Sequence, residues 1–436
     1  EVSSPVFACV TPNDPFYPVG TSSVGQWGVK RVGLPEAWDV TTGSGDIVVA
    51  VLDTGINPNI NDFSGRIVSP YSVLNDSEIW PAWQDASDSG HGTAVAGIAA
   101  AQGNNAQGIA GAAWNVKIMP VKISDNGESD TVTLAKAIQY AASHGADVIN
   151  VSFATPPGSG AGQTLKDAVE SAIGKGALIV AASGNWGATS VGYPAGLPGV
   201  IGVGATDQSD ARWVQENESS NTGSALDLAA PGGRIISYYK ASGERFGYYG
   251  GTSLASPLVA GVAALMLSVK PALTPEQITD ILADTADDLG QTGWDKEFGA
   301  GLLDAKEAVS RAAEGASTTT TTTAGTTTTT NPGATTTTTE PAGPRFSDVS
   351  EDSTPYWYEI EYLAGRGVVN GFTDGMFYPE DPIKRQQFAK MITLTVGCSV
   401  SSADTCPFID VTRVAGELYP YHYIAAAYQC GFTEGT

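Results

Sequence analysis

The chain has 436 residues, with 22 lysines and arginines against 46 aspartates and glutamates, and its formal net charge at pH 7 is −24. This length predicts two or three domains. A surface this acidic disfavours nucleic acid and anionic membranes as partners. We expect a soluble, secreted monomer, although the charge is equally consistent with a role in solubility alone.

Residues 46–311 alternate between short apolar runs and helical stretches. The runs are unbroken by polar residues, which is typical of strands buried on both faces of a parallel sheet. We predict strands within residues 46–53, 116–123, 146–153, 177–184 and 200–207. We predict helices within residues 91–101, 131–145, 164–176 and 274–286, the last of which closes the domain together with residues 299–309. The alternation predicts an α/β fold with a doubly wound, mostly parallel sheet, whose functional residues gather beyond the carboxyl ends of the strands.

The longest apolar stretch covers residues 255–269. A membrane-spanning helix needs about 18 or more apolar residues. Because no stretch reaches that length, we predict no transmembrane segment and interpret residues 255–269 as a helix in the core.

The composition changes abruptly after residue 316. Residues 317–344 begin as a tract of almost pure threonine, which has no apolar groups to bury and cannot form a core. Residues 345–436 are rich in aromatic residues and carry the opening F-x-D-V twice. We therefore expect a large domain over residues 1–316, a Thr-rich linker, and a small, mainly helical region whose second repeat stops incomplete at Thr436.

A candidate nucleophile lies in the segment GGTSLASPLVAG, where Ser253 stands among small residues at the start of an apolar helical run. A serine hydroxyl is a weak nucleophile until a base removes its proton and a third group orients that base. The chain has three histidines. His144 ends a predicted helix and His422 lies among tyrosines, whereas His91 heads a helix of small residues and is the candidate base.

Two further residues complete a possible catalytic set. Asp53 ends a predicted buried strand, where a carboxylate is alternatively a turn or cap residue. Asn185 follows another predicted strand, where Gly-Asn is ordinarily a turn pair. An amide at that place could also donate a hydrogen bond to the oxyanion that forms when serine attacks a carbonyl.

The motifs DTG, HGT, SGN and GTSLASP, in that order, resemble those of the subtilisin-type serine proteases, the subtilases. The resemblance implies that Asp53 orients His91, that His91 is the general base, that Ser253 is the nucleophile and that Asn185 completes the oxyanion hole. It extends from about residue 11 to residue 312.

The same resemblance implies how substrate binds. In this family the substrate pairs as an added strand with an edge of the enzyme. The corresponding residues here are Ser152, Phe153 and Ala154, with Ser183 and Gly184 on the second side.

A calcium site is implied as well. Asp14, Asp62 and Asn105, with the backbone carbonyls of Gln107 and Ile109, resemble the family's strong calcium site. Calcium takes six to eight oxygen ligands from carboxylates, amides and carbonyls. The alternative is that these residues belong to three separate polar loops.

The C-terminal block resembles S-layer homology modules, which hold exported bacterial proteins on cell-wall polymers. The likeness is carried by FSDV and by GVVNGFTDGMFYPEDPIKRQQFAKM, in which Arg385 could meet an anionic polymer. It implies a protein associated with the cell wall or cell surface, whereas a stability or spacer module is the alternative.

Together these motifs predict a secreted serine endopeptidase that hydrolyses peptide bonds of proteins through an acyl-enzyme on Ser253. A catalytically silent cell-surface scaffold of the same fold is the alternative. A lipase-type esterase fits poorly, because GTSLA lacks the second glycine of G-x-S-x-G. A zinc protease is disfavoured because the chain has no H-E-x-x-H.

Overall fold

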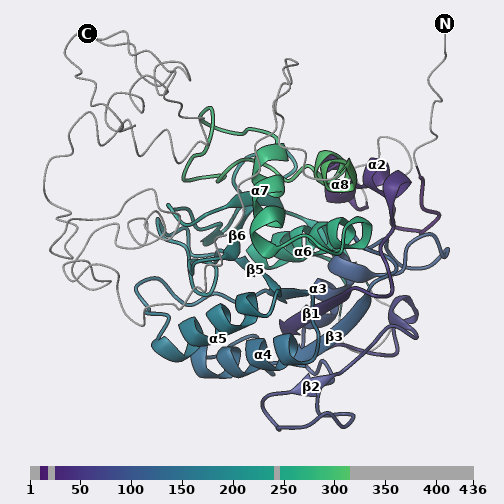
Figure 1. Cartoon of the computed structure of the whole chain (residues 1–436), viewed down its shortest axis with the longest axis vertical. Coiled ribbons are helices and arrows are strands. Elements are labelled where there is room, and N and C mark those ends of the chain that lie inside the picture. The colour runs from purple at the N-terminus through teal and green to yellow at the C-terminus, as the bar shows by residue number, and fades with distance from the viewer. Residues whose placement is uncertain (1–9, 18–24, 240–245, 315–436) are drawn as a thin grey trace, which may run out of the picture. The chain divides into compact units, whose positions relative to one another are not determined.

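The computed structural model describes residues 10–17, 25–239 and 246–314 (Figure 1). The predicted linker, residues 317–344, and the predicted C-terminal repeats, residues 345–436 with Arg385 and His422, lie outside the described residues.

A seven-stranded parallel sheet forms the centre of the domain, in the order β2-β3-β1-β4-β5-β6-β9. Its strands are β1 (Val48–Asp53), β2 (Tyr71–Ser72), β3 (Lys117–Lys122), β4 (Val148–Val151), β5 (Leu178–Ala182), β6 (Val200–Thr206) and β9 (Leu228–Pro231). The predicted α/β fold and all five predicted strands are confirmed, and β2 and β9 join them at the two edges.

The sheet is buried on both faces, which is why its strands read as continuous apolar runs. In β1, Val49 and Val51 pack into the core cluster on one face, whereas Ala50 and Leu52 pack into the cluster on the other. All four side chains are at most 1% exposed. Successive side chains of β1 therefore point to opposite faces of the sheet. Because both faces are buried, the strand shows no alternation of apolar and polar residues in the sequence.

Helices cover both faces, as predicted for a doubly wound sheet (Figure 1). On one face lie α4 (Thr131–Ser143) and α5 (Gln163–Gly174), and on the other lie α3 (His91–Ala100) and α6 (Thr252–Val269). The remaining elements are α1 (Trp27–Arg31), α2 (Leu34–Val40), α7 (Pro275–Thr285), α8 (Ala305–Glu314), a 3-10 turn (Asn61–Phe63) and the strand pairs β7 (Val214–Gln215) with β8 (Glu218–Ser219) and β10 (Ile235–Tyr238) with β11 (Phe246–Tyr249).

Side chains cap the N-termini of α7 and α8. Helix α7 begins as expected, with Thr274 accepting from the N–H of Gln277 and Gln277 reaching back in a capping box. Helix α8 begins at Ala305, within the segment 299–309 that was expected to close the domain. The side chain of Asp304 accepts a hydrogen bond from the N–H of Glu307 and so caps α8.

Helix α6 is longer than its apolar stretch suggested. It has 18 residues with a mean hydropathy of 1.8, so by length and composition alone it could cross a membrane. Of that window 83% is buried inside the domain, where the helix packs on β4, β5, β6 and β9. The expectation that no stretch reaches 18 residues was wrong, because the helix also takes in residues 252–254, whereas its interpretation as a core helix is confirmed.

The sheet order places one crevice at a defined edge. Strand β1 lies between β3 and β4, and from β1 the chain first extends the sheet through β3 and then returns to add β4 on the other side. Such a reversal leaves a crevice outside the carboxyl ends of the two strands, where α/β proteins bind their ligands.

Candidate active site

The four residues expected to act in catalysis stand where regular elements begin or end. Asp53 is the last residue of β1 and His91 is the first residue of α3. Ser253 lies in the first turn of α6, and Asn185 follows the carboxyl end of β5. Because β1, β4 and β5 are parallel neighbours, their ends bring residues far apart in the sequence to one edge of the sheet.

Asp53 and His91 form a close pair. The Nδ1 atom of His91 lies 2.7 Å from Oδ1 of Asp53, and their side chains are 26% and 3% exposed, respectively. The same Oδ1 accepts the N–H of Thr54 at 2.7 Å. A carboxylate only accepts hydrogen bonds, so the imidazole proton belongs on Nδ1 and the lone pair on Nε2.

The pKa of His91 is raised from its usual range. Burial alone would lower the pKa, but the charge of Asp53 and its hydrogen bond, together with the charge of Asp85, outweigh that effect. A raised pKa makes His91 the stronger base for the proton of a neighbouring hydroxyl.

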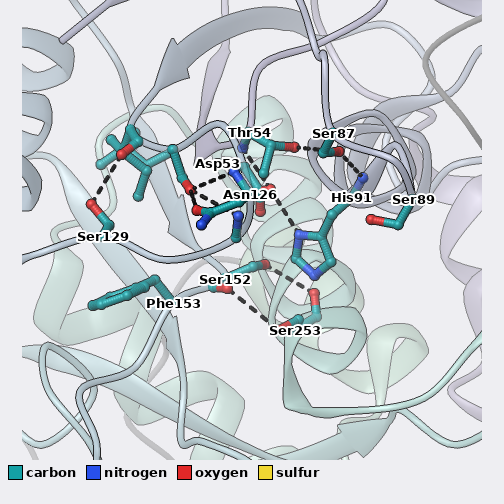
Figure 2. Close-up of a pocket in the computed structure, with 14 residues that line it drawn as sticks. Asp53, Thr54, Ser87, Ser89, His91, Asn126, Ser129, Ser152, Phe153 and Ser253 are labelled. Atoms are coloured by element: carbon teal, nitrogen blue, oxygen red, sulfur yellow. Dashed lines mark hydrogen bonds and ion pairs between the residues drawn. The ribbon is translucent and has the colours of Figure 1, made fainter. Parts of the chain in front are cut away.

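Ser253 lies beside this pair. Figure 2 shows its side chain directed toward the imidazole of His91, at the edge of a cavity of about 220 Å³ that all three residues line. The Ser253 hydroxyl donates to the carbonyl oxygen of Ser152 at 3.3 Å, and the Ser152 hydroxyl donates to the carbonyl of Ser253 at 2.9 Å. These reciprocal bonds fix the first turn of α6 to the chain that leaves β4.

Asn185 is oriented by the residue before Ser253. Its Oδ1 accepts both the N–H and the hydroxyl of Thr252, at 3.0 and 2.9 Å. The amide nitrogen Nδ2 lies over Gly251, where an added Cβ would stand 2.8 Å from it and where φ is +132°. Glycine is therefore needed at residue 251, and Nδ2 is held next to the N-terminus of α6, whose first N–H groups have no intrahelical partner.

The arrangement has the parts needed for acyl transfer. Ser253 supplies a hydroxyl, and the Asp53 carboxylate orients the imidazole of His91. The amide of Asn185 and the first N–H groups of α6 lie beside the hydroxyl as donors. These groups can activate a nucleophile and stabilise an oxyanion on the attacked carbonyl.

Comparison with known proteins gives the family. Residues 44–301 match the Subtilase family, and residues 345–389 match the S-layer homology domain. The chain belongs to the subtilase family. Both resemblances inferred from the sequence are thereby confirmed, the second for residues outside the described structure.

Individual relatives agree with this assignment. Thermitase of Thermoactinomyces vulgaris is 39% identical over 302 residues, which are 69% of this chain and 99% of thermitase. A thermophilic serine proteinase of Bacillus sp. (strain AK1) is 40% identical over 305 residues, 70% of each chain. A solved structure of a protease from Pseudoalteromonas arctica has a TM-score of 0.60 and 33% identity, covering 70% of this chain and 100% of that one. This subtilase is a serine endopeptidase.

The residues expected to bind substrate differ in their exposure. Ser152 and Phe153, which follow β4, line the cavity of this subtilase. Ser183 is fully buried, and its carbonyl accepts from Asn221 Nδ2 at 2.9 Å. The N–H of Gly184 donates to Thr252 Oγ1 at 3.2 Å. Ser183 and Gly184 thus support the segment that carries Asn185 and are not among the residues that line the cavity.

Ala154, the third residue expected to bind substrate after β4, is not among the residues that line the cavity, and neither is Trp186, which no motif indicated. A Cβ at Gly192 would lie 2.9 Å from the methyl group of Ala154, and a Cβ at Gly184 would lie 2.8 Å from the Trp186 ring. Glycine at residues 192 and 184 therefore leaves room for the Ala154 methyl group and for the Trp186 ring. The cavity is also lined by Ser124, Asn126, Gly127 and Ser129, which the sequence did not indicate. Asn126 and Ser129 are labelled in Figure 2.

The residues expected to bind calcium come together only in part. Asp14 and Asp62 are 3% and 1% exposed, and Asn105 Nδ2 donates to Asp62 Oδ1 at 2.7 Å. Gln107 donates its N–H to Asn105 Oδ1 at 2.9 Å, and the N–H of Ile109 bonds the Asp62 carboxylate. The N–H of Asn104 donates to Asp14 Oδ2 at 2.6 Å, so the loop over residues 104–109 contacts both carboxylates.

Burial raises the pKa of Asp14 and of Asp62, and the charge of Asp14 raises the pKa of Asp62 further. Two buried carboxylates that disfavour each other's charge suit a cation between them. Within the described residues no three His, Cys, Asp or Glu side chains cluster for a metal, so calcium here would depend on amide and carbonyl oxygens. Tyr238, which sequence reasoning missed, donates its hydroxyl to Asp62 Oδ2.

His144 has no part in the site. It caps the C-terminus of α4, and its ring stacks on Tyr140 with 3.8 Å between ring centroids. Its Nδ1 lies 2.8 Å from the carbonyl oxygen of Tyr140. The interpretation of His144 as a residue of a helix end is confirmed.

Proposed function

We propose that this subtilase hydrolyses peptide bonds of proteins by transient acylation of Ser253. The observation that carries the proposal is the 2.7 Å pair of His91 and Asp53 beside Ser253 on one cavity. The endopeptidase activity belongs to the family, whereas the roles of the individual residues rest on this geometry.

Each residue has a defined part in the reaction. His91 Nε2 takes the proton of the Ser253 hydroxyl as its Oγ attacks the scissile carbonyl, and the imidazolium then gives that proton to the leaving amine. Asp53 holds the imidazole through Nδ1 and stabilises its charge. A water molecule, activated by His91 in the same way, hydrolyses the ester and restores Ser253.

The oxyanion is stabilised by Asn185 and the N-terminus of α6. Because Thr252 holds Oδ1 of Asn185, the amide donor is oriented before substrate binds. A donor that is already in place costs no reorganisation when charge develops, and one such donor is worth about 10²–10³-fold in kcat.

The substrate lies as an added strand along Ser152, Phe153 and Ala154. This segment follows β4, and the carbonyl of Ser152 accepts a hydrogen bond from the Ser253 hydroxyl. Backbone pairing of substrate with this segment therefore brings a scissile carbonyl to the hydroxyl. The methyl group of Ala154 narrows the space for the side chain before the scissile bond, and Gly184 leaves room for the Trp186 ring.

Covalent labelling tests the assignment of the nucleophile. A fluorophosphonate probe is expected to label the folded protein once per chain, and peptide mapping should place the label on Ser253. Prior incubation with an unlabelled fluorophosphonate serves as the control and should block labelling. A folded protein that takes no label, or takes it on another residue, contradicts the proposal and favours the silent scaffold.

We also propose a structural calcium ion at Asp14, Asp62 and Asn105, with the carbonyl oxygens of Gln107 and Ile109. Calcium binding is general in the family. Calcium would offset the repulsion between the two buried carboxylates and crosslink the N-terminal segment to the loop that follows α3.

Finally, we propose that the C-terminal region, residues 345–436, holds the secreted enzyme on an anionic cell-wall polymer, with residues 317–344 as a spacer from the protease domain, residues 1–316. The match of residues 345–389 to the S-layer homology domain supports this. The full chain should sediment with purified bacterial cell walls, and Arg385→Ala should weaken binding about tenfold if a charge-assisted hydrogen bond is lost. A full chain that stays in the supernatant contradicts wall binding.

A further inference from the structure

A second buried carboxylate lies behind the catalytic pair. Asp85, in the loop between β2 and α3, is 0% exposed. Its Oδ1 accepts from Thr54 Oγ1 at 3.0 Å and from the hydroxyl and N–H of Ser87 at 2.7 and 3.2 Å. Its Oδ2 accepts from the hydroxyl and N–H of Thr93 at 2.6 and 2.9 Å. Asp85 does not line the cavity, so it does not touch substrate.

The hydroxyl groups that donate to Asp85 also accept hydrogen bonds from backbone N–H groups. Thr54 Oγ1 accepts the N–H of Gly92 at 2.9 Å, and Ser87 Oγ accepts the N–H of His91 at 3.2 Å. Thr93 Oγ1 accepts the N–H of Asn57 at 3.1 Å. The dashed lines between Thr54, Ser87 and His91 in Figure 2 show part of this network.

The network therefore joins the two elements that carry the catalytic pair. Thr54 directly follows Asp53 at the end of β1, whereas Gly92 and Thr93 directly follow His91 in α3. The two elements are also packed tightly, because a Cβ at Gly92 would lie 2.2 Å from the carbonyl oxygen of Gly55. A small displacement of either element would lengthen the 2.7 Å contact between His91 and Asp53.

Asp85 also acts on His91 through its charge. Two carboxylates act on the charge of His91, Asp53 from β1 and Asp85 from the preceding loop, and Tyr249 from β11 contacts Ser89, two residues before His91. Tyr249 donates its hydroxyl to the carbonyl of Ser89, and burial and the charge of Asp85 raise its pKa, so it stays neutral. The exposed Asp88 is screened by water. The charges of Asp53 and Asp85 both favour the imidazolium.

We propose that Asp85 is a positioning residue of the reaction, which fixes the end of β1 against the start of α3 and, through its charge, stabilises the imidazolium that forms when His91 takes the proton of Ser253. The proposal rests on the catalytic roles given above. It assigns a function to a residue that contacts neither the substrate nor the reacting atoms.

The variant Asp85→Asn tests both parts. It removes the charge and turns one oxygen into a donor that faces other donors, so kcat is expected to fall about 10²-fold, as for a small misplacement of a catalytic group. KM should change little, because Asp85 lies outside the cavity lining. The acid limb of the profile of kcat/KM against pH should move to lower pH, because loss of the Asp85 charge lowers the pKa of His91.

Asp88→Asn is the matched control. It removes the same charge from the same loop, closer to His91 in sequence but exposed to solvent, and should leave kcat and the acid limb unchanged. A folded Asp85→Asn variant whose acid limb coincides with that of the control overturns the proposal. If the wild type itself shows no Ser253-dependent activity, it is the proposed function that fails.

If Asp85→Asn does not fold, Thr93→Val carries the test. It removes the 2.6 Å hydroxyl bond to Asp85 two residues from His91 but keeps the charge, so kcat should fall with no shift of the acid limb. Thr93→Ser keeps the hydroxyl and should restore kcat. A Thr93→Val variant with the wild-type kcat overturns the proposal.

Discussion

Replacement of Ser253 by alanine is expected to lower kcat about 10⁶-fold with little change in the fold. Loss of the nucleophile or of the base in subtilisin has an effect of this size. Within the described residues the Ser253 side chain makes one hydrogen bond, from its hydroxyl to the carbonyl of Ser152 at 3.3 Å. Its removal should therefore hardly affect the free energy of unfolding. The measurement is single-turnover hydrolysis of a peptide ester or amide, with circular dichroism to show that the variant is folded.

Additivity distinguishes a working catalytic set from isolated side chains. If His91 acts only by activating Ser253, then His91→Ala in the Ser253→Ala background should cost little more. Asn185→Ala should cost about 10²–10³-fold in the wild-type background, because one oxyanion donor is lost while nucleophile and base remain. If the loss of kcat in the Ser253→Ala, His91→Ala double variant equals the product of the two single losses, the two residues do not share one mechanism.

The sequence predicted what depends on the pattern along the chain. Five strands could be recognised because both of their faces are buried, as for Val49 to Leu52 in β1. Strand β2, with two residues, is too short to leave a periodic signal.

The proposed catalytic residues could be singled out from the sequence because each stands in a local motif at the end of an element. Asp85 was missed because its hydrogen-bond partners come together only in the folded structure. Its partners Thr54, Ser87 and Thr93 come from three segments, and no short pattern unites them. Ser183 lies within a recognised motif, but its side chain is fully buried and its carbonyl accepts a hydrogen bond from Asn221, so its contact with substrate stays a prediction.

Removal of calcium is expected to lower the thermal stability of the protease domain strongly. A ligand present at about 1,000 times its Kd stabilises the folded state by about 4 kcal/mol, which in a domain of this size corresponds to a rise in Tm on the order of 10 °C. The measurement is a thermal melt with calcium and with a chelator, in the Ser253→Ala background so that no chain digests another.

The dependence on pH follows from the raised pKa values of Asp14 and Asp62. A carboxyl group whose pKa is higher in the folded than in the unfolded state loses stability as pH rises through this range, because the folded state resists ionisation. Without calcium, Tm should therefore fall as pH rises above about 4, the usual value for an aspartate. With calcium, which binds the ionised pair, Tm should hold or rise over the same range.

The variant Asp62→Asn separates a calcium site from a general effect of salt. It removes one of the two carboxylates and relieves the repulsion with Asp14, so the difference in Tm between calcium and chelator should shrink. Asp167→Asn, an exposed carboxylate on α5, is the matched control and should keep the wild-type difference. If calcium raises Tm equally in both variants, the ion binds elsewhere, and the close approach of Asp14 and Asp62 is a cost that the fold carries without a metal.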